Sequence, residues 1–194
     1  MKFKTIVKKI INERNKYQSL MFNHILQESL FRGSLNENAD NNKREDVLDK
    51  IRKGDWEKPQ NPESFKNSME LSTRKEMLTQ YSVGELKQME LYKLDGYNIG
   101  FALKKRDDGS KEIVAVHNNE PDVKSVGADL VKAAVSLGGC YLDHFDGHLS
   151  DFYSKLGFVE YDRDLFDPQY DEDGSFRAKY GESDVIYRKH KNCK

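Results

Sequence analysis

The sequence predicts a mixed α/β fold in which helices cover the faces of a single sheet, preceded by an N-terminal helical extension. Three strand-like segments separated by turn dipeptides lie between residues 89 and 117, and helical and strand patterns then alternate toward the end of the chain. Apolar residues cluster after Met89, which places the expected core in the second half. We therefore expect the folded domain over residues 70–194, and a helical extension with a polar linker over residues 1–69.

The extension is expected to begin with two amphipathic helices. Apolar residues recur at helical spacing over Phe3–Ile11 and again over Leu20–Phe31. These stripes would pack on the main domain or, alternatively, dock on a protein partner. Residues 34–68 are polar and hold two of the four prolines, which is typical of a loosely ordered linker with few core contacts. A short helix over Arg44–Lys53 is expected within this linker.

The sheet is expected to begin with an antiparallel meander. Ser82 and Glu85 have the spacing of a capping box, so a short helix should open just before the first strand. The dipeptide Asp95-Gly96 is a typical hairpin turn. The predicted strands are Glu90–Leu94, Tyr97–Lys104 and Glu112–His117.

The second half alternates helices with strands. A helix with one apolar face is predicted over Gly127–Leu137 and is stopped by two glycines. Because parallel strands need a crossover connection, the strand Cys140–Phe145 should lie beside Glu112–His117 and run parallel to it. The remaining predicted elements are a helix over Leu149–Leu156 and strands over Phe158–Arg163 and Asp184–Arg188.

The composition argues against two classes of partner. The 32 Lys and Arg residues and 33 Asp and Glu residues give a net charge of -1, which supports neither a nucleic-acid partner nor a membrane surface. No apolar run approaches the ~18 residues of a membrane span. The two cysteines have neither disulfide-framework nor metal-type spacing. We expect free thiols, Cys140 in the core and Cys193 on the tail, in a reducing, cytoplasmic compartment.

One heptapeptide carries a resemblance to a known family. Residues 152–158, FYSKLGF, follow a predicted strand and helix, and in this setting they resemble the end of the fourth helix in the GNAT N-acetyltransferase superfamily. The resemblance implies a GNAT-like mixed sheet with a parallel pair at its centre, and transfer of an acetyl group from acetyl-CoA to an amine. It also implies that the Tyr153 hydroxyl points at the sulfur of coenzyme A, where a phenol can protonate the thiolate leaving group.

The same resemblance assigns the contacts to acetyl-CoA. In the family, a turn of pattern Q/R-x-x-G-x-G/A before the crossover helix holds the pyrophosphate with backbone N–H groups. Asp122 and Ser125 depart from that pattern, and an aspartate repels a pyrophosphate. The strand end at Val116 and His117 would offer backbone groups to the acyl amide. The implied turn residues are Lys124, Ser125, Val126, Gly127 and Ala128.

The polar end of the fourth strand supplies candidate bases. Asp143 and His144 lie where the sheet of the family splays, and either could deprotonate an amine, directly or through water. The alternative is that this segment is only a turn at Asp146. We expect no metal site, because three neighbouring ligands on one turn rarely form one. The acidic segment Asp164–Asp184 would favour a cationic acceptor such as a lysine or another amine, or would simply be solvated.

Two functions follow from these features. The segment from about Ser72 to Lys189 also resembles small GNAT-like proteins encoded by bacteriophages, which would place the protein in the host cytoplasm. The first function is acetyl transfer from acetyl-CoA to an amine. The alternative is a catalytically inactive GNAT-like phage protein, in the virion or the host, that docks on a partner through its N-terminal helices. Asp122 and Ser125 favour the alternative, whereas Tyr153 favours the enzyme.

Overall fold

The computed structural model describes residues 37–58, 60–72, 78–170, 174, 177–178 and 181–193. The helices expected over Phe3–Ile11 and Leu20–Phe31 lie outside these residues. No described helix combines the length and the apolar character that a membrane crossing needs. The helical elements are α2 (Glu37–Lys53), α3 (Pro62–Glu70), α4 (Val83–Leu86), α5 (Gly127–Ser136), α6 (His148–Lys155) and the short 3-10 turn η2 (Pro168–Tyr170). The strands are β1 (Glu90–Lys93), β2 (Ile99–Lys105), β3 (Lys111–Asn118), β4 (Gly139–Phe145), β5 (Phe158–Asp164) and β6 (Val185–His190).

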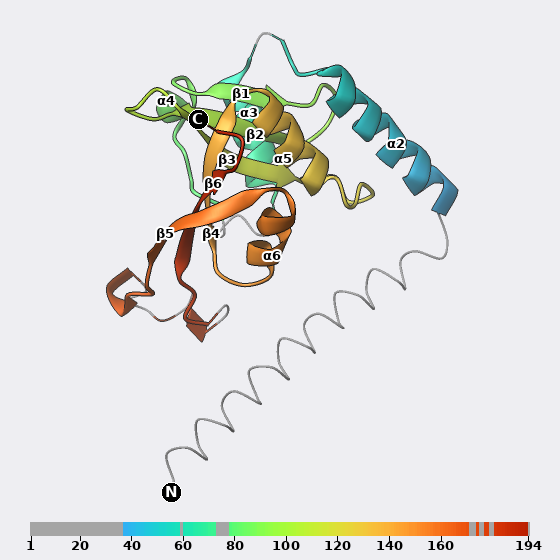
Figure 1. Ribbon diagram of the computed structural model, residues 1–194. Coiled ribbons are helices and arrows are strands. Elements are labelled where there is room, and N and C mark those ends of the chain that lie inside the picture. The colour runs from blue at the N-terminus through green and yellow to red at the C-terminus, as the bar shows by residue number, and fades with distance from the viewer. Residues whose placement is uncertain are drawn as a thin grey trace, which may run out of the picture. The chain divides into compact units, whose positions relative to one another are not determined.

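The six strands form one mixed sheet in the order β1-β2-β3-β4-β6-β5 (Figure 1). Strands β1, β2 and β3 are successive antiparallel neighbours, whereas β3 and β4 are parallel. Strand β6 lies antiparallel between β4 and β5. The predicted mixed α/β class, the meander and the parallel pair joined by the α5 crossover are therefore confirmed.

The predicted start of α4 is also confirmed in atomic detail. The Ser82 hydroxyl accepts a hydrogen bond from the backbone N–H of Glu85 at 3.2 Å. The Glu85 carboxylate in turn accepts one from the backbone N–H of Ser82 at 2.7 Å. Two N–H groups that the helix itself cannot bond are thereby satisfied, and the short helix is directed into β1.

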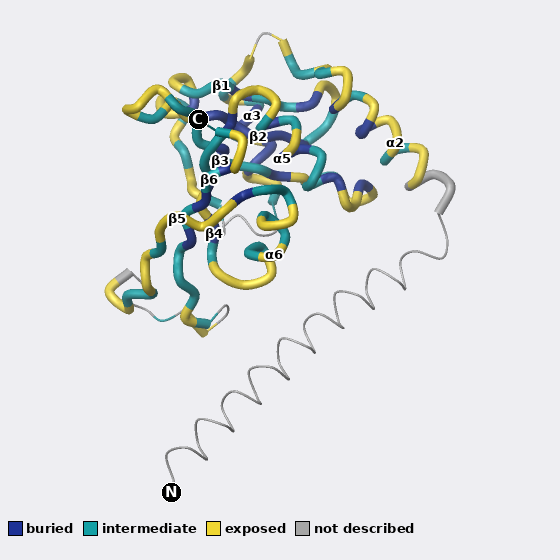
Figure 2. Tube along the Cα trace, viewed as in Figure 1, coloured by how far each residue is buried: buried dark blue, intermediate teal, exposed yellow. Residues whose placement is uncertain are grey.

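Two hydrophobic clusters, one on each face of the sheet, form the core. One cluster joins α2 and α5 to the sheet and contains Phe101, while the other joins α3 and α4 to the sheet and contains Ala102. Successive strand residues point to opposite faces, so the clusters lie on the two sides of the sheet. Buried residues gather along the central strands, and β5 is exposed over most of its length at the sheet edge (Figure 2).

Residues 43–69 are not the linker that their composition predicts. Residues from Lys43 onward form one compact unit. The α2 side chains Val47 and Ile51 are 0% and 6% exposed, and the α3 side chains Phe65 and Met69 are 0% and 3% exposed. The expectation of few core contacts is therefore wrong for these residues. The apolar residues are few, but they share one helix face, and the average composition of the segment conceals that arrangement.

The two cysteines form a disulfide between Cys140 and Cys193, with Cα atoms 5.7 Å apart. The expectation of free thiols is therefore wrong. The inference of a reducing compartment, which depended on free thiols, loses its support. Strands β4 and β6 are antiparallel neighbours, with Tyr141 opposite Lys189, so the start of β4 meets the residues that follow β6. The sequence separation of 53 residues conceals this proximity.

Candidate active site

The parallel strands β3 and β4 are joined only at their beginnings. Their register pairs Lys111 with Gly139 and Glu112 with Tyr141, and no later residue of either strand has a partner on the other. A Cβ atom on Gly139 would lie 2.5 Å from the Ile113 side chain, so the strands approach closely at this end. Beyond it, the facing edges of the two strands carry backbone groups that no strand pairing satisfies. Such groups need a partner, which can be water or a ligand.

A bulge in β3 accounts for the separation. Gly100 of β2 pairs with His117 and Ala102 pairs with Val114, so two residues of β3 stand opposite Phe101 alone. One of these two residues, Ala115, has a φ of 54°, in the left-handed region that residues with a side chain rarely adopt. A bulge bends its strand and increases the local twist. The end of β3 is thereby turned away from β4.

The two residues expected to meet the acyl amide lie at this bend. Val116 is partly buried against the cluster that contains α5. His117 is 5% exposed, its Nδ1–H donates to the carbonyl of Ala115 at 2.9 Å, and its Nε2 accepts from Ser68 Oγ at 2.8 Å. Burial lowers the pKa of His117 to about 4. Its imidazole is a satisfied core group, so only its backbone is available to a ligand.

The turn before α5 presents backbone donors. Val126, at the N-cap, makes no side-chain capping bond, and the first amides that bond back to its carbonyl are those of Asp129 and Leu130. The amides of Gly127 and Ala128 therefore remain at the free end of the helix. Ser125 has a φ of 61°, the conformation that a glycine would adopt most easily at this place. The departure from the family pattern at Ser125 thus leaves the backbone in a glycine-like shape.

Two cations from α2 lie beside this turn. Lys43 Nζ is 3.0 Å from a Glu120 oxygen and 3.7 Å from an Asp122 oxygen. Arg44 Nε donates to the carbonyl of Lys124 at 3.2 Å. The negative charge of Asp122 is therefore partly offset by Lys43. Neither cation was identified from the sequence, because both lie in the segment interpreted as a linker.

Asp143 lies on the sheet face opposite α5 and α6. Its neighbours on β4, Leu142 and His144, are buried on the α6 side, so alternation directs Asp143 to the other side. Burial, and then the charge of Asp143, raise the pKa of Glu112 on β3. Burial also raises the pKa of Asp143, although its residue surface is exposed and water must screen the carboxylate. The exposure argues that this rise is modest.

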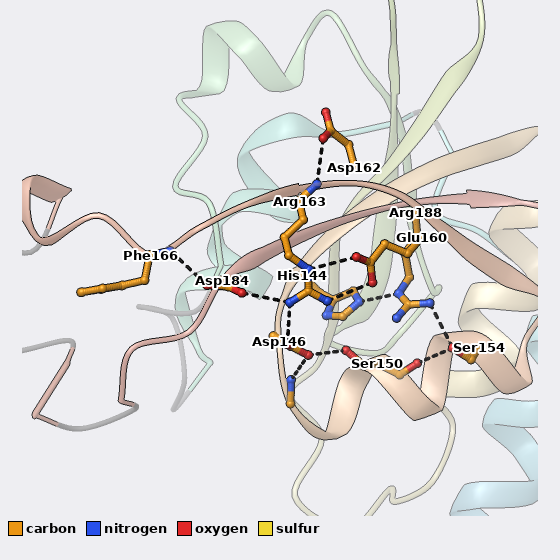
Figure 3. A network of polar contacts seen from close by, with 11 residues as sticks. His144, Asp146, Ser150, Ser154, Glu160, Asp162, Arg163, Phe166, Asp184 and Arg188 are labelled. Atoms are coloured by element: carbon orange, nitrogen blue, oxygen red, sulfur yellow. Dashed lines mark hydrogen bonds and ion pairs between the residues drawn. The ribbon is translucent and has the colours of Figure 1, made fainter. Parts of the chain in front are cut away.

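His144 is held on the opposite face by a network that includes Arg188 (Figure 3). Arg188 Nε–H donates to His144 Nε2 at 2.8 Å, and His144 Nδ1 lies 2.8 Å from the carbonyl of Phe145. Burial, and to a smaller extent the charge of Arg188, lower the pKa of His144, while the bond to the Phe145 carbonyl opposes this shift. Both ring nitrogens are engaged, so the structure gives no free nitrogen for proton abstraction. Arg188 was not identified from the sequence.

The second arginine in Figure 3, Arg163, binds three carboxylates. It contacts Asp146, Glu160 and Asp184, each at 2.9 Å. These contacts tie the turn before α6 to strand β5 and to the residue preceding β6. No group of His, Cys, Asp and Glu among the described residues is arranged to hold a metal ion.

Tyr153 on α6 carries a hydroxyl with no bonded partner among the described residues. Its ring lies 5.1 Å from that of His144 and 5.9 Å from that of Phe158, measured between centroids. Burial, and then the charge of Asp143, raise the pKa of Tyr153 to about 12. The phenol is thus protonated at neutral pH and electrostatically coupled to Asp143.

Glu112 is a further candidate that sequence reasoning missed. Its position at the closed end of the splayed strands follows from the pairing of Glu112 with Tyr141. Tyr81 joins the same surface, because the charges of Asp143 and Glu112 contribute to raising its pKa after the effect of burial. A separate cavity of about 410 Å³ involves none of these residues; it is lined by Lys50, Gly54, Asp55, Trp56, Lys58 and Asp95.

Comparisons with known proteins leave the family open. No protein-family model and no curated protein matches the chain. A solved structure from Bacillus anthracis str. Ames, described as a streptothricin acetyltransferase in complex with acetyl coenzyme A, is similar over 47% of this chain and 54% of that chain, with 19% identity and a TM-score of 0.31. The chain spans about half the length of that protein. A similarity of this size carries no argument about function, so the fold class stated above rests on strand order and pairing.

Proposed function

We propose that this chain is a GNAT-type acyltransferase that moves the acetyl group of acetyl-CoA to an amine. The observation that carries the proposal is the separation of β3 and β4 beyond Glu112 and Tyr141. It leaves an unpaired backbone edge in the middle of a sheet, and an extended ligand with amide groups can satisfy such an edge as an added strand does. The hydroxyl of Tyr153, which has no bonded partner in the described part of the chain, and the carboxylate of Asp143 flank strand β4 from its two faces.

The turn before α5 fits the phosphate end of the coenzyme mainly through backbone donors. The left-handed Ser125 followed by the uncapped amides of Gly127 and Ala128 resembles the concave N–H arrangements that bind anions. Lys124 is exposed beside them. Val126 is fully buried and would anchor the turn without touching the ligand.

Asp143 and Tyr153 would each carry out one proton transfer, Asp143 as the base and Tyr153 as the acid. Bound acetyl-CoA would supply the acetyl thioester, whose C–S bond breaks as the amine nitrogen forms the new C–N bond. Asp143 would accept the proton released by the amine, directly or through one water. Tyr153 would donate its hydroxyl proton toward the departing sulfur. His144, which the sequence offered as the alternative base, receives no proton in this scheme because both its nitrogens are engaged.

The coupling between Asp143 and Tyr153 would assist the second transfer. The Asp143 charge is one of the causes that hold the pKa of Tyr153 near 12, which is high for an acid that must protonate a thiolate. Once Asp143 has taken the amine proton, that charge is gone and the pKa of Tyr153 falls. The base therefore makes the acid stronger within one turnover.

The acceptor is proposed to be a lysine or another cationic amine. Glu112 and Asp143 present two carboxylates on one face of the opening, and such a pair attracts a positive charge. The cationic amine must lose one proton to water before it can attack, and Asp143 accepts the second proton as the C–N bond forms.

The first test is a thermal unfolding scan of the oxidised full chain with and without acetyl-CoA. A ligand at 100 times its Kd adds about 2.7 kcal/mol of stability, so a clear rise in Tm is expected. The second test is Tyr153→Phe, assayed for acetylation of a polyamine or a lysine peptide. Loss of a general acid lowers kcat by ~10²–10⁴-fold and leaves the KM for acetyl-CoA little changed.

Tyr161→Phe is the matched control, because Tyr161 is 48% exposed on β5. It should leave kcat unchanged. Full activity of Tyr153→Phe would remove Tyr153 from the mechanism.

One observation favours a non-catalytic protein of the same shape. The Asp122 side chain is 58% exposed and carries a negative charge beside the turn that would hold the pyrophosphate. On this alternative, acetyl-CoA neither raises the Tm nor is consumed. A rise in Tm without acetyl transfer to any amine would instead indicate a protein that binds the coenzyme without catalysis.

A further inference from the structure

Arg188 on β6 is a buried cation held by hydrogen bonds. It is 5% exposed, and within the described part of the chain no carboxylate forms an ion pair with it. Burying a charge is costly unless hydrogen bonds compensate for the lost water. Its neighbour across the sheet, Glu160 on β5, is bonded to Arg163 and acts on Arg188 only through its charge. The bonds that Arg188 makes must therefore account for its presence.

Those bonds reach three other elements. Nε–H donates to His144 Nε2 on β4 at 2.8 Å, and Nη1 donates to Ser154 Oγ on α6 at 3.0 Å. Nη1 also contacts the carbonyl of Phe158 at 3.4 Å. The guanidinium thus joins β6 to β4 and α6, as Figure 3 shows, and also to the start of β5.

The bond to His144 selects one protonation state. A guanidinium can only donate, so His144 Nε2 must accept and must carry no proton. The remaining ring proton is then on Nδ1, where it donates to the carbonyl of Phe145 at 2.8 Å. His144 is held neutral, as the Nδ1–H tautomer, in one orientation.

Helix α6 depends on these polar contacts because it has no fully buried side chain. Its partly buried residues Phe152 and Tyr153, and Leu156 directly after the helix, pack against the core. Arg188 holds the residue next to Tyr153, which is Ser154, and also the imidazole against which the Tyr153 ring rests at 5.1 Å. Arg188 therefore contacts both residues that position the Tyr153 phenol, Ser154 and His144.

We infer that Arg188 is a positioning residue that sets the orientation of Tyr153 through His144 and Ser154. The part of this inference that concerns catalysis rests on the proposed function, whereas the control of His144 does not. The charged and titratable groups that face His144 are Arg188 from β6, Tyr153 from α6 and Asp146 from the following turn, and the charge of Asp143 acts on it from the other face of the sheet. The two aspartates favour protonation of His144, so removal of Arg188 leaves only burial to oppose them.

The first experiment follows the ring nitrogens of His144 by ¹⁵N NMR during a pH titration of the full-length oxidised protein. In the unaltered chain His144 should remain the neutral Nδ1–H tautomer below the ordinary histidine pKa of ~6.5. Arg188→Met should let the ring titrate at higher pH, because the cation that faces Nε2 and prevents its protonation is gone. Arg163→Met is the control, because Arg163 on β5 binds Asp146, Glu160 and Asp184 but does not touch His144. An unchanged titration in Arg188→Met would overturn the inference.

The second experiment measures acetyl transfer. Arg188→Met should lower kcat by about 10²-fold, the loss expected from displacing a catalytic group by about 1 Å, with the KM for acetyl-CoA nearly unchanged. His144→Gln removes the same support from its other end. We expect His144→Gln to reproduce the fall in kcat. If Arg188→Met does not fold, His144→Gln serves as the test in its place.

The two hypotheses fail in different ways. Absence of acetyl transfer in the unaltered chain, together with the expected NMR change, would refute the proposed function and retain the control of His144 by Arg188. Full kcat in Arg188→Met or His144→Gln would refute the positioning of Tyr153 even if the protein is an acetyltransferase.

Discussion

Acidification should destabilise this protein through one buried histidine, His117. In the folded state burial lowers the pKa of its imidazole from 6.5 to about 4. Between these two values the unfolded chain binds a proton that the folded chain does not, so stability falls as the pH falls. The stability is fully present above the unfolded pKa, is lost progressively below it, and changes no further below the folded pKa.

The magnitude follows from the size of the shift. A difference of about 2.5 pKa units corresponds to about 3 kcal/mol at ~1.36 kcal/mol per unit. At pH 5 the unfolded chain is almost fully protonated at this site and the folded chain only slightly, so about 2 kcal/mol of the loss is already present. This is a large share of the ~5–15 kcal/mol that stabilises an ordinary domain.

Urea unfolding of the oxidised full chain at pH 8 and pH 5 measures this loss. Other groups titrate over the same range, including His144, whose pKa is also lowered. The comparison is therefore made with His117→Gln, which cannot titrate at this position and retains a polar group near Ser68. The unaltered chain should lose about 2 kcal/mol more than the variant between the two pH values. Equal losses in the two proteins would refute the assignment of a buried neutral imidazole at this position.

Two further predictions concern elements that the sequence analysis misjudged. Cys193→Ser opens a loop of 53 residues and should lower the free energy of unfolding by about 4 kcal/mol, the chain-entropy value for a loop of this length. Urea unfolding under oxidising conditions measures this loss. The same loss in the unaltered protein after reduction would confirm the cause, whereas equal stability with and without reductant would contradict the disulfide bond. Ile51→Ala in α2 should lower the free energy of unfolding by about 2–5 kcal/mol, because Ile51 is buried. Arg52→Ala alters an exposed neighbour and should lower it by less than about 0.5 kcal/mol. Similar small effects of both substitutions would show that α2 is not part of the core.

Local patterns determined the elements of this fold. The strands β1 to β3 are bounded by turn dipeptides, and the capping box at Ser82 and Glu85 depends on two residues three positions apart. The parallel pairing of β3 and β4 was also accessible, because a helix between two strands imposes a crossover. Each of these inferences uses residues that are near one another in the chain, where geometry leaves few alternatives.

Alternation along β4 could separate Asp143 from His144 but could not assign their roles. Both side chains have acid–base chemistry, and the sequence therefore offered both as candidate bases. What distinguishes them is the arginine at position 188, 44 positions after His144, which engages one ring nitrogen while the Phe145 carbonyl engages the other. The pairing of β4 with β6 brings these residues together, and no local pattern encodes that contact.

The sequence by itself therefore determined the class of fold, the order of its elements and the residues from which a site could be built. Tertiary structure alone decided the Cys140–Cys193 bond, the inclusion of α2 and α3 in the core, and the neutral state of His144. The physical reason is the same in each case. Secondary structure follows from interactions within a few residues, whereas burial, charge and bonding at a given side chain depend on partners that only the packing of distant segments supplies.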